Sequence, residues 1–268
     1  RFRSYDRQRQ GGKRTGMLTF SLQSGSNGNA IYVEAGDVRL LFDAGISGKQ
    51  AEGRMRVRGR EMRDLDALII SHDHADHIRC AGIYQRKFGL PIYLTRKTHG
   101  ATYCQLGRLT DVRYFQAGQP LRFGSVTVHT LRTPHDAADG VCFIVEHDGK
   151  RLGIMTDLGH VFEGLAGHLA RVDACYLESN YDPDMLARGP YPFHLQQRIR
   201  GQRGHLPNLD AAQLVRATGG HLKWVTLSHL SENNNHPELA LDTHRRCVGR
   251  SFPFFLADRY AVSEVMEL

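Results

Sequence analysis

Short apolar stretches separated by turn-forming residues dominate the chain from residue 17 onward. Stretches rich in Val, Ile, Leu and Phe and bounded by Gly, Asp or Asn are typical of buried strands, whereas apolar positions three or four apart predict helices. We expect strands at residues 17–23, 30–34, 38–43, 65–70, 91–94, 112–115, 126–130, 142–147, 151–156, 174–178, 224–227 and 254–256. We expect helices at residues 49–58, 78–88, 97–106 and 239–248, with further helices before residue 218.

The order of these elements divides the chain into two similar halves. A strand-rich first half is closed by helices, and strands followed by helices then appear again toward the C-terminus. Two such halves predict two mixed sheets that face each other, with helices covering their outer faces. The predicted fold class is therefore α/β (α+β), with the architecture of a four-layer αββα sandwich.

Length and composition restrict the class of protein. With 268 residues, the chain is long enough for one large domain or two small ones. No apolar run approaches the ~18 residues needed to cross a bilayer, and no signal sequence opens the chain, so we expect a cytoplasmic protein without membrane contact. The five cysteines are scattered and form no C-x-x-C pair. This spacing argues against a disulfide framework and against a structural zinc knuckle.

The formal net charge of +7 is concentrated at the N-terminus. Residues 1–16 contain six Lys or Arg and one Asp, a net +5, which leaves +2 for residues 17–268. This leader lacks apolar periodicity, so we expect a disordered basic extension or expression remnant, followed by one domain over residues 17–268. Two basic clusters, within residues 54–63 and 198–203, either neutralise nucleic-acid phosphates or form solvated helix faces.

Residues 71–77, Ser-His-Asp-His-Ala-Asp-His, have the composition of a metal-binding loop. They follow a buried strand, and His72 and His74 are two positions apart, so in an extended loop both side chains point the same way and can bind one ion. Asp76 and His77 come just after and can face a second ion. Neutral imidazole with carboxylate suits zinc and related divalent metals.

Three further residues at strand ends complete a candidate ligand set. His135, Asp157 and His229 each follow a predicted strand, and strand ends converge on one edge of a sheet sandwich. Alone, each would more often be a cap or a solvated loop residue. Together with the loop they predict a first ion held by His72, His74 and His135, a second held by Asp76, His77 and His229, and Asp157 as a bridge.

A site for two neighbouring divalent ions, zinc or manganese, indicates hydrolytic chemistry. A shared water held as hydroxide near neutral pH would be the nucleophile, and the ions would stabilise charge on the attacked centre. Asp76 is the expected catalytic carboxylate that helps to position this hydroxide. Asp43 is expected not to bind an ion itself but to accept a hydrogen bond from a ligand imidazole. An ordinary turn before Ala44-Gly45 would also explain an aspartate at this position.

The pattern His-x-His-x-Asp-His, followed by His135, Asp157 and His229, resembles the metallo-β-lactamase fold hydrolases. The resemblance covers residues 17–268 and implies the αββα sandwich and a dinuclear site. Four short strings are similar to the YycJ/WalJ branch of that superfamily, which implies a 5′-to-3′ exonuclease directed at DNA. These strings lie at residues 24–30, 177–182, 189–192 and 228–234.

Several polar residues near these loops are candidates for binding the substrate phosphate. Ser26, Asn27 and Asn29 lie in a Gly/Ser/Asn turn whose backbone N–H groups can surround an anion, although a plain hairpin turn is equally consistent. Asn180, His194 and His205 lie in the segment between the strands ending at 178 and 227, and could clamp a terminal 5′ phosphate. His205 is also the expected catalytic acid for the leaving group.

The residues predict a metal-dependent phosphodiesterase, and the resemblance implies a 5′-to-3′ exonuclease that acts on DNA or another single-stranded nucleic acid. The residues alone leave open DNA against RNA and the polarity of digestion. One alternative is a hydrolase of the same fold with a small substrate, such as a cyclic phosphodiesterase. A second is a nucleic-acid-binding regulatory protein with structural metals, which the open ligand set disfavours because structural sites are usually coordinatively closed. The ligands do not choose between zinc and manganese, and the sequence predicts no oligomeric state.

Overall fold

The computed structural model describes residues 16–268. The predicted leader, residues 1–16, lies outside this range except for Gly16, so the expectation of disorder stays a prediction. Within the described residues, no helix combines the length and the apolar character needed to cross a membrane.

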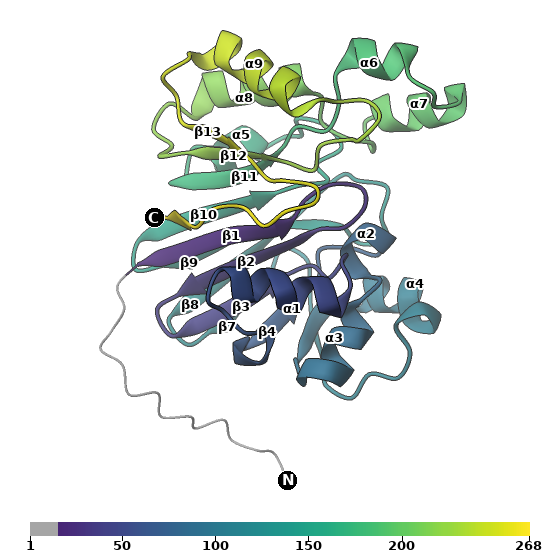
Figure 1. The fold of residues 1–268 in the computed structure, drawn as a ribbon, viewed down its shortest axis with the longest axis vertical. Helices are drawn as coiled ribbons and strands as arrows, with labels where there is room; N and C mark the ends of the chain where they lie inside the picture. The colour runs from purple at the N-terminus through teal and green to yellow at the C-terminus, as the bar shows by residue number, and fades with distance from the viewer. Residues whose placement is uncertain (1–15) are drawn as a thin grey trace.

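Two seven-stranded sheets form the centre of the molecule (Figure 1). The first sheet has the order β14-β1-β2-β3-β4-β5-β6. Its strands are β1 (Met17–Gln23), β2 (Ala30–Ala35), β3 (Val38–Phe42), β4 (Ala67–Ile69), β5 (Ile92–Thr95), β6 (Val112–Phe115) and β14 (Met266–Glu267). The pairs from β14 to β3 are antiparallel and those from β3 to β6 are parallel.

The second sheet follows the same plan, in the order β13-β12-β11-β10-β9-β8-β7. Its strands are β7 (Leu121–Phe123), β8 (Val126–Arg132), β9 (Val141–His147), β10 (Lys150–Met155), β11 (Ala174–Glu178), β12 (Val225–Ser228) and β13 (Phe254–Leu256). The pairs from β7 to β10 are antiparallel and those from β10 to β13 are parallel.

Helices cover the outer faces of both sheets, as Figure 1 shows. The helices on the first sheet are α1 (Gly48–Val57), α2 (Ala75–Ile78), α3 (Ala81–Phe88) and α4 (Arg96–Leu106), with a 3-10 turn at Met62–Asp64. Those on the second are α5 (Leu165–Leu169), α8 (Asn208–Thr218) and α9 (Pro237–Val248), while α6 (Pro183–Arg188) and α7 (Phe193–Arg200) project at one end.

Three large apolar clusters lie between these four layers. One joins the two sheets, where the rings of Phe42 and Phe143 lie 5.0 Å apart, and the other two join each sheet to its helices. Strands buried on both faces, such as β2 and β11, carry near-continuous apolar sequence for this reason. The predicted four-layer αββα sandwich is confirmed.

The helix predicted at residues 78–88 was wrong in one respect. It begins at Ala81 as α3, and residues 75–78 form a separate helix, α2, because the backbone between the two is tied to the loop after β3. The Ala44 N–H donates to the carbonyl of His77 over 2.6 Å, and the Cys80 N–H donates to the carbonyl of Ala44 over 3.0 Å. Asp76 and His77 therefore lie on a helical turn rather than in an open loop. The short elements β7, α5 and β14 were not predicted from the sequence.

Candidate metal centre

The loops that leave the parallel strands of both sheets meet at one edge of the sandwich. His72 and His74 follow β4, Asp157 follows β10 and His229 follows β12, while His135 lies in the loop between β8 and β9. All seven sequence-predicted ligands are brought together in overlapping groups whose ligand atoms lie within 4.8 Å of one another. These residues are His72, His74, Asp76, His77, His135, Asp157 and His229.

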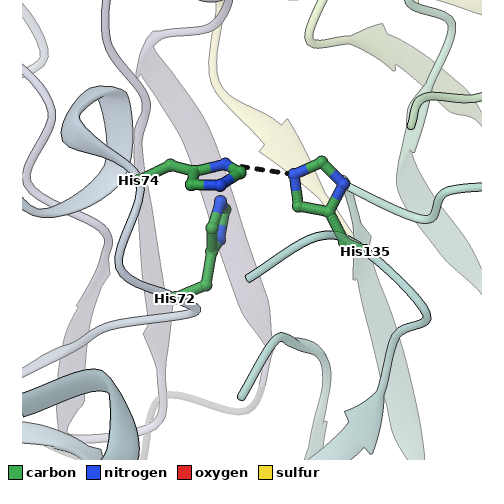
Figure 2. A group of neighbouring side chains, drawn as sticks. All are labelled: His72, His74 and His135. Carbon is green, nitrogen blue, oxygen red and sulfur yellow. Dashed lines mark hydrogen bonds between the residues drawn. The ribbon is translucent and has the colours of Figure 1, made fainter. Parts of the chain in front are cut away.

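The first group contains three imidazoles. Figure 2 shows His72 and His74 from one loop meeting His135 from the other sheet, with Nε2 of His135 3.1 Å from Nδ1 of His74. The rings of His72 and His74 are 4.7 Å apart between centroids, and those of His72 and His135 are 5.3 Å apart. This spacing suits three nitrogen ligands around one ion.

The second group contains Asp76, His77 and His229. Oδ2 of Asp76 lies 3.2 Å from Nε2 of His229 and 3.5 Å from Nε2 of His77. Asp157 lies between the two groups, since its Oδ2 is 3.2 Å from Nε2 of His77 and its Oδ1 is 3.5 Å from Nε2 of His135. A carboxylate in this position can reach both groups at once.

Three buried atoms at the centre of the cluster lack hydrogen-bond partners. They are both carboxylate oxygens of Asp157 and Nε2 of His72. Buried polar atoms are normally satisfied, since leaving one unpaired costs about 1–3 kcal/mol. All three are good ligands for a divalent cation, so the donor set fits a metal ion.

The backbone at the site is held in an uncommon conformation. Asp43, Asp157 and His229 have φ angles of 65°, 56° and 56°, in the left-handed region that non-glycine residues rarely adopt. Such strain is kept only where surrounding contacts over-determine it, and it clusters at functional sites. Here it turns the side chains of Asp157 and His229 toward the ligand cluster and that of Asp43 toward Ser71 and His77.

The imidazoles are oriented by hydrogen bonds on their other nitrogen atoms. Nδ1 of His77 lies 2.7 Å from Oδ2 of Asp43, and Nδ1 of His135 donates to the carbonyl of Gly204 over 2.8 Å. Asp43 also accepts from the backbone N–H of Ser71 over 2.8 Å and from its hydroxyl over 2.9 Å. Fixing Nδ1–H in this way leaves Nε2 free to bind a cation.

The carboxylates give the site a strong preference for positive charge. Burial lowers the pKa of His229, but Asp157, Asp76 and Glu178 outweigh it and raise this pKa to about 10. Burial likewise opposes protonation of His77, yet Asp157, Asp76 and Asp43 raise its pKa well above the usual value. The protons on these two rings occupy positions where a divalent ion would supply the same charge.

Glu178 is a site residue that the sequence analysis did not select. It ends β11, is fully buried, and its Oε1 lies 2.8 Å from Nδ1 of His205, while its Oε2 accepts from the backbone N–H of Leu158 over 2.7 Å. Burial raises its pKa, but the hydrogen bonds with His205 and His229 outweigh burial and lower the pKa to about 2. Its position at a strand end on the same edge as Asp157 was the available signal.

The candidate phosphate contacts divide into two groups. Asn29, Asn180 and His205 lie at the cluster: Nδ2 of Asn29 is 3.0 Å from Nε2 of His77, Asn180 donates to the carbonyl of His229 over 2.7 Å, and the ring of His205 is 4.9 Å from that of His135. Ser26 and Asn27 lie on the turn between β1 and β2, exposed and half-buried, and His194 is exposed on α7.

Comparison with known proteins agrees with this geometry. Residues 38–227 match the family described as "Beta-lactamase superfamily domain". The chain is 36% identical over 224 residues to exodeoxyribonuclease WalJ of Streptococcus pneumoniae, which covers 82% of this chain and 83% of the relative. It is 36% identical over 227 residues to exodeoxyribonuclease YycJ of Bacillus anthracis, covering 83% and 86%.

A solved structure shows the same fold at lower sequence identity. The metallo-β-lactamase fold protein YhfI of Bacillus subtilis superimposes with a TM-score of 0.74 at 20% identity, over 95% of this chain and 100% of YhfI. The family predicted from residues 71–77 and the strings around them is therefore confirmed. The chain belongs to the metallo-β-lactamase superfamily, in the family that contains the WalJ and YycJ proteins.

Proposed function

We propose that the chain is a metal-dependent phosphodiesterase that degrades DNA from its 5′ end. The observation that carries this proposal is Asp157, a buried carboxylate with two unpartnered oxygens between two groups of imidazoles. The names of the WalJ and YycJ relatives, both exodeoxyribonucleases, support DNA as the substrate.

The proposed cofactor is a pair of divalent ions, zinc or manganese. His72, His74 and His135 would hold one, Asp76, His77 and His229 the other, and Asp157 both. When bound, such ions lower the pKa of water and neutralise charge that develops on a phosphate.

The protein's own residues would bind the substrate and move one proton. Glu178 holds Nδ1 of His205 and so orients the ring, which leaves Nε2 of His205 to donate a proton to the departing sugar oxygen. Asn180 and Asn29, whose side-chain amides contact His229 and His77, and the 24–29 turn would lie against the terminal phosphate. Asp76, beside His229, would orient the attacking water.

A cytoplasmic setting and a nucleic-acid partner belong to the same proposal. All five cysteines are free, which is typical of reducing compartments.

The test uses metal-free protein reloaded with Mn²⁺ or Zn²⁺ and end-labelled, 5′-phosphorylated DNA and RNA in single- and double-stranded form. We expect nucleotides to be released from the 5′ end of DNA, at a rate that falls steeply with rising salt because phosphate binding displaces counterions. His74→Ala and Asp157→Asn should abolish turnover with an unchanged circular dichroism spectrum. Full activity in both variants, or salt-insensitive hydrolysis of cyclic phosphodiesters alone, would contradict the proposal.

A further inference from the structure

The segment immediately after the metal-binding loop is strongly basic. Residues 78–110 contain no Asp or Glu and six Lys or Arg. The six are Arg79, Arg86, Lys87, Arg96, Lys97 and Arg108. The run itself therefore carries only positive charge, which attracts polyanions.

Part of this charge is used inside the protein. Arg79 donates to the carbonyls of Gly45 and Asn27, Arg86 donates to the carbonyl of Leu106, and Lys87 pairs with Glu52. Among residues 16–268, the side chains of the other three have no carboxylate within salt-bridge distance. They are Arg96, Lys97 and Arg108, all exposed on or just after α4.

Helix α4 begins beside the candidate metal centre. It starts directly after β5, and β5 pairs in parallel with β4, whose C-terminal end leads into residues 71–77. The pairing continues past β4, since the Ile70 N–H donates to the carbonyl of Tyr93. Figure 1 shows α2 and α4 on the same side of the molecule. A chain bound at the metal centre can therefore continue along α4.

Aromatic and cationic side chains form a row along this helix. The guanidinium of Arg96 lies 4.2 Å from the ring centroid of Tyr114 on β6, Nδ1 of His99 lies 2.7 Å from the Tyr114 hydroxyl, and the rings of His99 and Tyr103 are 5.8 Å apart. Tyr103 is 67% exposed and Tyr114 is 41% exposed. Exposed apolar side chains that are contiguous, rather than scattered singly, mark an interaction site.

Three members of the row, His99, Tyr103 and Tyr114, line a hollow on the surface. Its volume is about 800 Å³, and its walls include His99, Tyr103, Tyr114 and Arg108, with no acidic residue. Leu109 and Val112 add apolar surface to its lining. Exposed rings beside arginine, in a hollow whose lining has no acidic residue, have the composition of surfaces that stack nucleobases.

We propose that Arg96, His99, Tyr103 and Tyr114 form a platform that stacks the bases of single-stranded DNA as it leaves the metal centre. The proposal rests on the proposed function for its substrate. The row runs from the edge that carries the metal centre along the outside of α4, so it contacts nucleotides beyond the scissile phosphate. Arg108 and Lys97 then neutralise the backbone phosphates. Binding through bases and phosphates of an unpaired strand does not depend on sequence.

The first experiment measures binding without cleavage. The full chain is mixed with a fluorescent oligothymidylate of about 20 nucleotides, a length that exceeds usual single-strand site sizes, in the presence of chelator, and anisotropy gives the dissociation constant. Tyr103→Leu with Tyr114→Leu should weaken binding by about tenfold or more, because each stacked base is lost. Tyr103→Phe with Tyr114→Phe should bind like the unmodified chain. An unchanged dissociation constant in the Leu pair overturns the platform.

Two controls keep this result interpretable. Phe255→Leu removes a different exposed ring, 43% exposed on β13 in the other sheet, and should leave binding unchanged. Equal weakening by Phe255→Leu would show non-specific binding and overturn the proposal. Arg96→Gln, at an exposed position, tests the row independently should the Leu pair lose its fold, and it should weaken binding by about threefold.

The second experiment separates the platform from the nuclease. With metal restored, hydrolysis of bis(p-nitrophenyl) phosphate and of a dinucleotide should be the same in the Leu pair and the unmodified chain, whereas KM for the oligothymidylate rises. If the Leu pair cleaves DNA with an unchanged KM, the platform proposal is contradicted and the proposed function still holds. If binding depends on the two tyrosines but no DNA is cleaved, the proposed function is contradicted and the platform proposal still holds.

Discussion

The two halves of the molecule have the same strand plan but supply different parts of the site. Strand β3 is antiparallel to β2 and parallel to β4, and β10 is likewise antiparallel to β9 and parallel to β11. Each is followed by an aspartate in the left-handed conformation, Asp43 with φ 65° and Asp157 with φ 56°. The same residue type thus stands near the C-terminal end of the corresponding strand in each sheet, directly after β3 and one residue further on after β10.

The surroundings of the two carboxylates differ. Asp43 accepts from the backbone and hydroxyl of Ser71 and contacts His77, so its oxygens are satisfied by protein. Both oxygens of Asp157 are buried and unpartnered. Asp43 therefore orients a ligand, whereas Asp157 faces the proposed position of the ions. The strand topology places each carboxylate, and the neighbouring residues decide its role.

The largest expected effect comes from Asp157→Asn. Removing the charge between the two imidazole groups should lower hydrolysis by more than about 10³-fold and reduce the number of bound ions, because a neutral amide is a poor bridge. Phosphodiester hydrolysis and the ion content by mass spectrometry measure this. Asp242→Asn, an exposed position on α9, is the control. Activity within tenfold of the unmodified chain would break the distinction between the two aspartates.

The helical layers of the two halves differ in how they satisfy buried polar groups. In α3 the hydroxyl of Tyr84 donates to the carbonyl of Ile46, whereas in α9 Nε2 of His244 is buried without a partner beside Phe254. Burial lowers the pKa of His244 to about 4, only partly opposed by its bond to Ala240. The second layer is therefore expected to be the more sensitive to acid.

The sign of this effect follows from linkage. Above pH ~6.5 His244 is neutral in both states; as pH falls toward 4 only the unfolded chain takes the proton, so folding loses about 3 kcal/mol. His244→Leu should remove that part of the loss. Urea unfolding of both proteins at several pH values gives the difference, and a constant difference between pH 7 and pH 4 would contradict it.

Ion binding should stabilise the folded chain measurably. At a free ion concentration of about 100 times the dissociation constant, binding contributes ~2.7 kcal/mol, which raises the melting temperature by roughly 5–10 °C for a chain of this size. Asp157→Asn should abolish most of this shift. Thermal unfolding with Mn²⁺ or Zn²⁺ against chelator measures it, and an equal shift in the variant would show that the ions bind elsewhere.

Asp43→Asn should have the smallest effect of the four. It leaves every proposed ligand in place but weakens the hold on His77, so we expect a loss of about 10–100-fold in ion affinity or activity. Titration of metal-free protein with Mn²⁺, alongside Asp157→Asn, compares the two positions directly. A loss as large as that of Asp157→Asn would mean that Asp43 itself binds an ion.

The sequence by itself determined the layers and half of the site. Hydrophobic patterns are visible within a short stretch of sequence, so most strands and helices could be predicted. Residues 71–77 could be recognised because their ligands are close together in the sequence. His135, Asp157 and His229 were selected only through their strand-end positions. Glu178 also ends a predicted strand, but a strand-end position alone does not show whether a carboxylate is buried in the site or faces solvent.

Only the tertiary structure decided which of these side chains meet. The break between α2 and α3 depends on hydrogen bonds to Ala44, far away in the sequence, and the contact of Glu178 with His205 depends on a loop that folds back over the second sheet. The row along α4 likewise needs Tyr114 from β6 beside Arg96. The periodicity of a single segment predicts which of its residues are buried. Which distant loops meet depends on how the strands pair and in which register, and no single segment determines that.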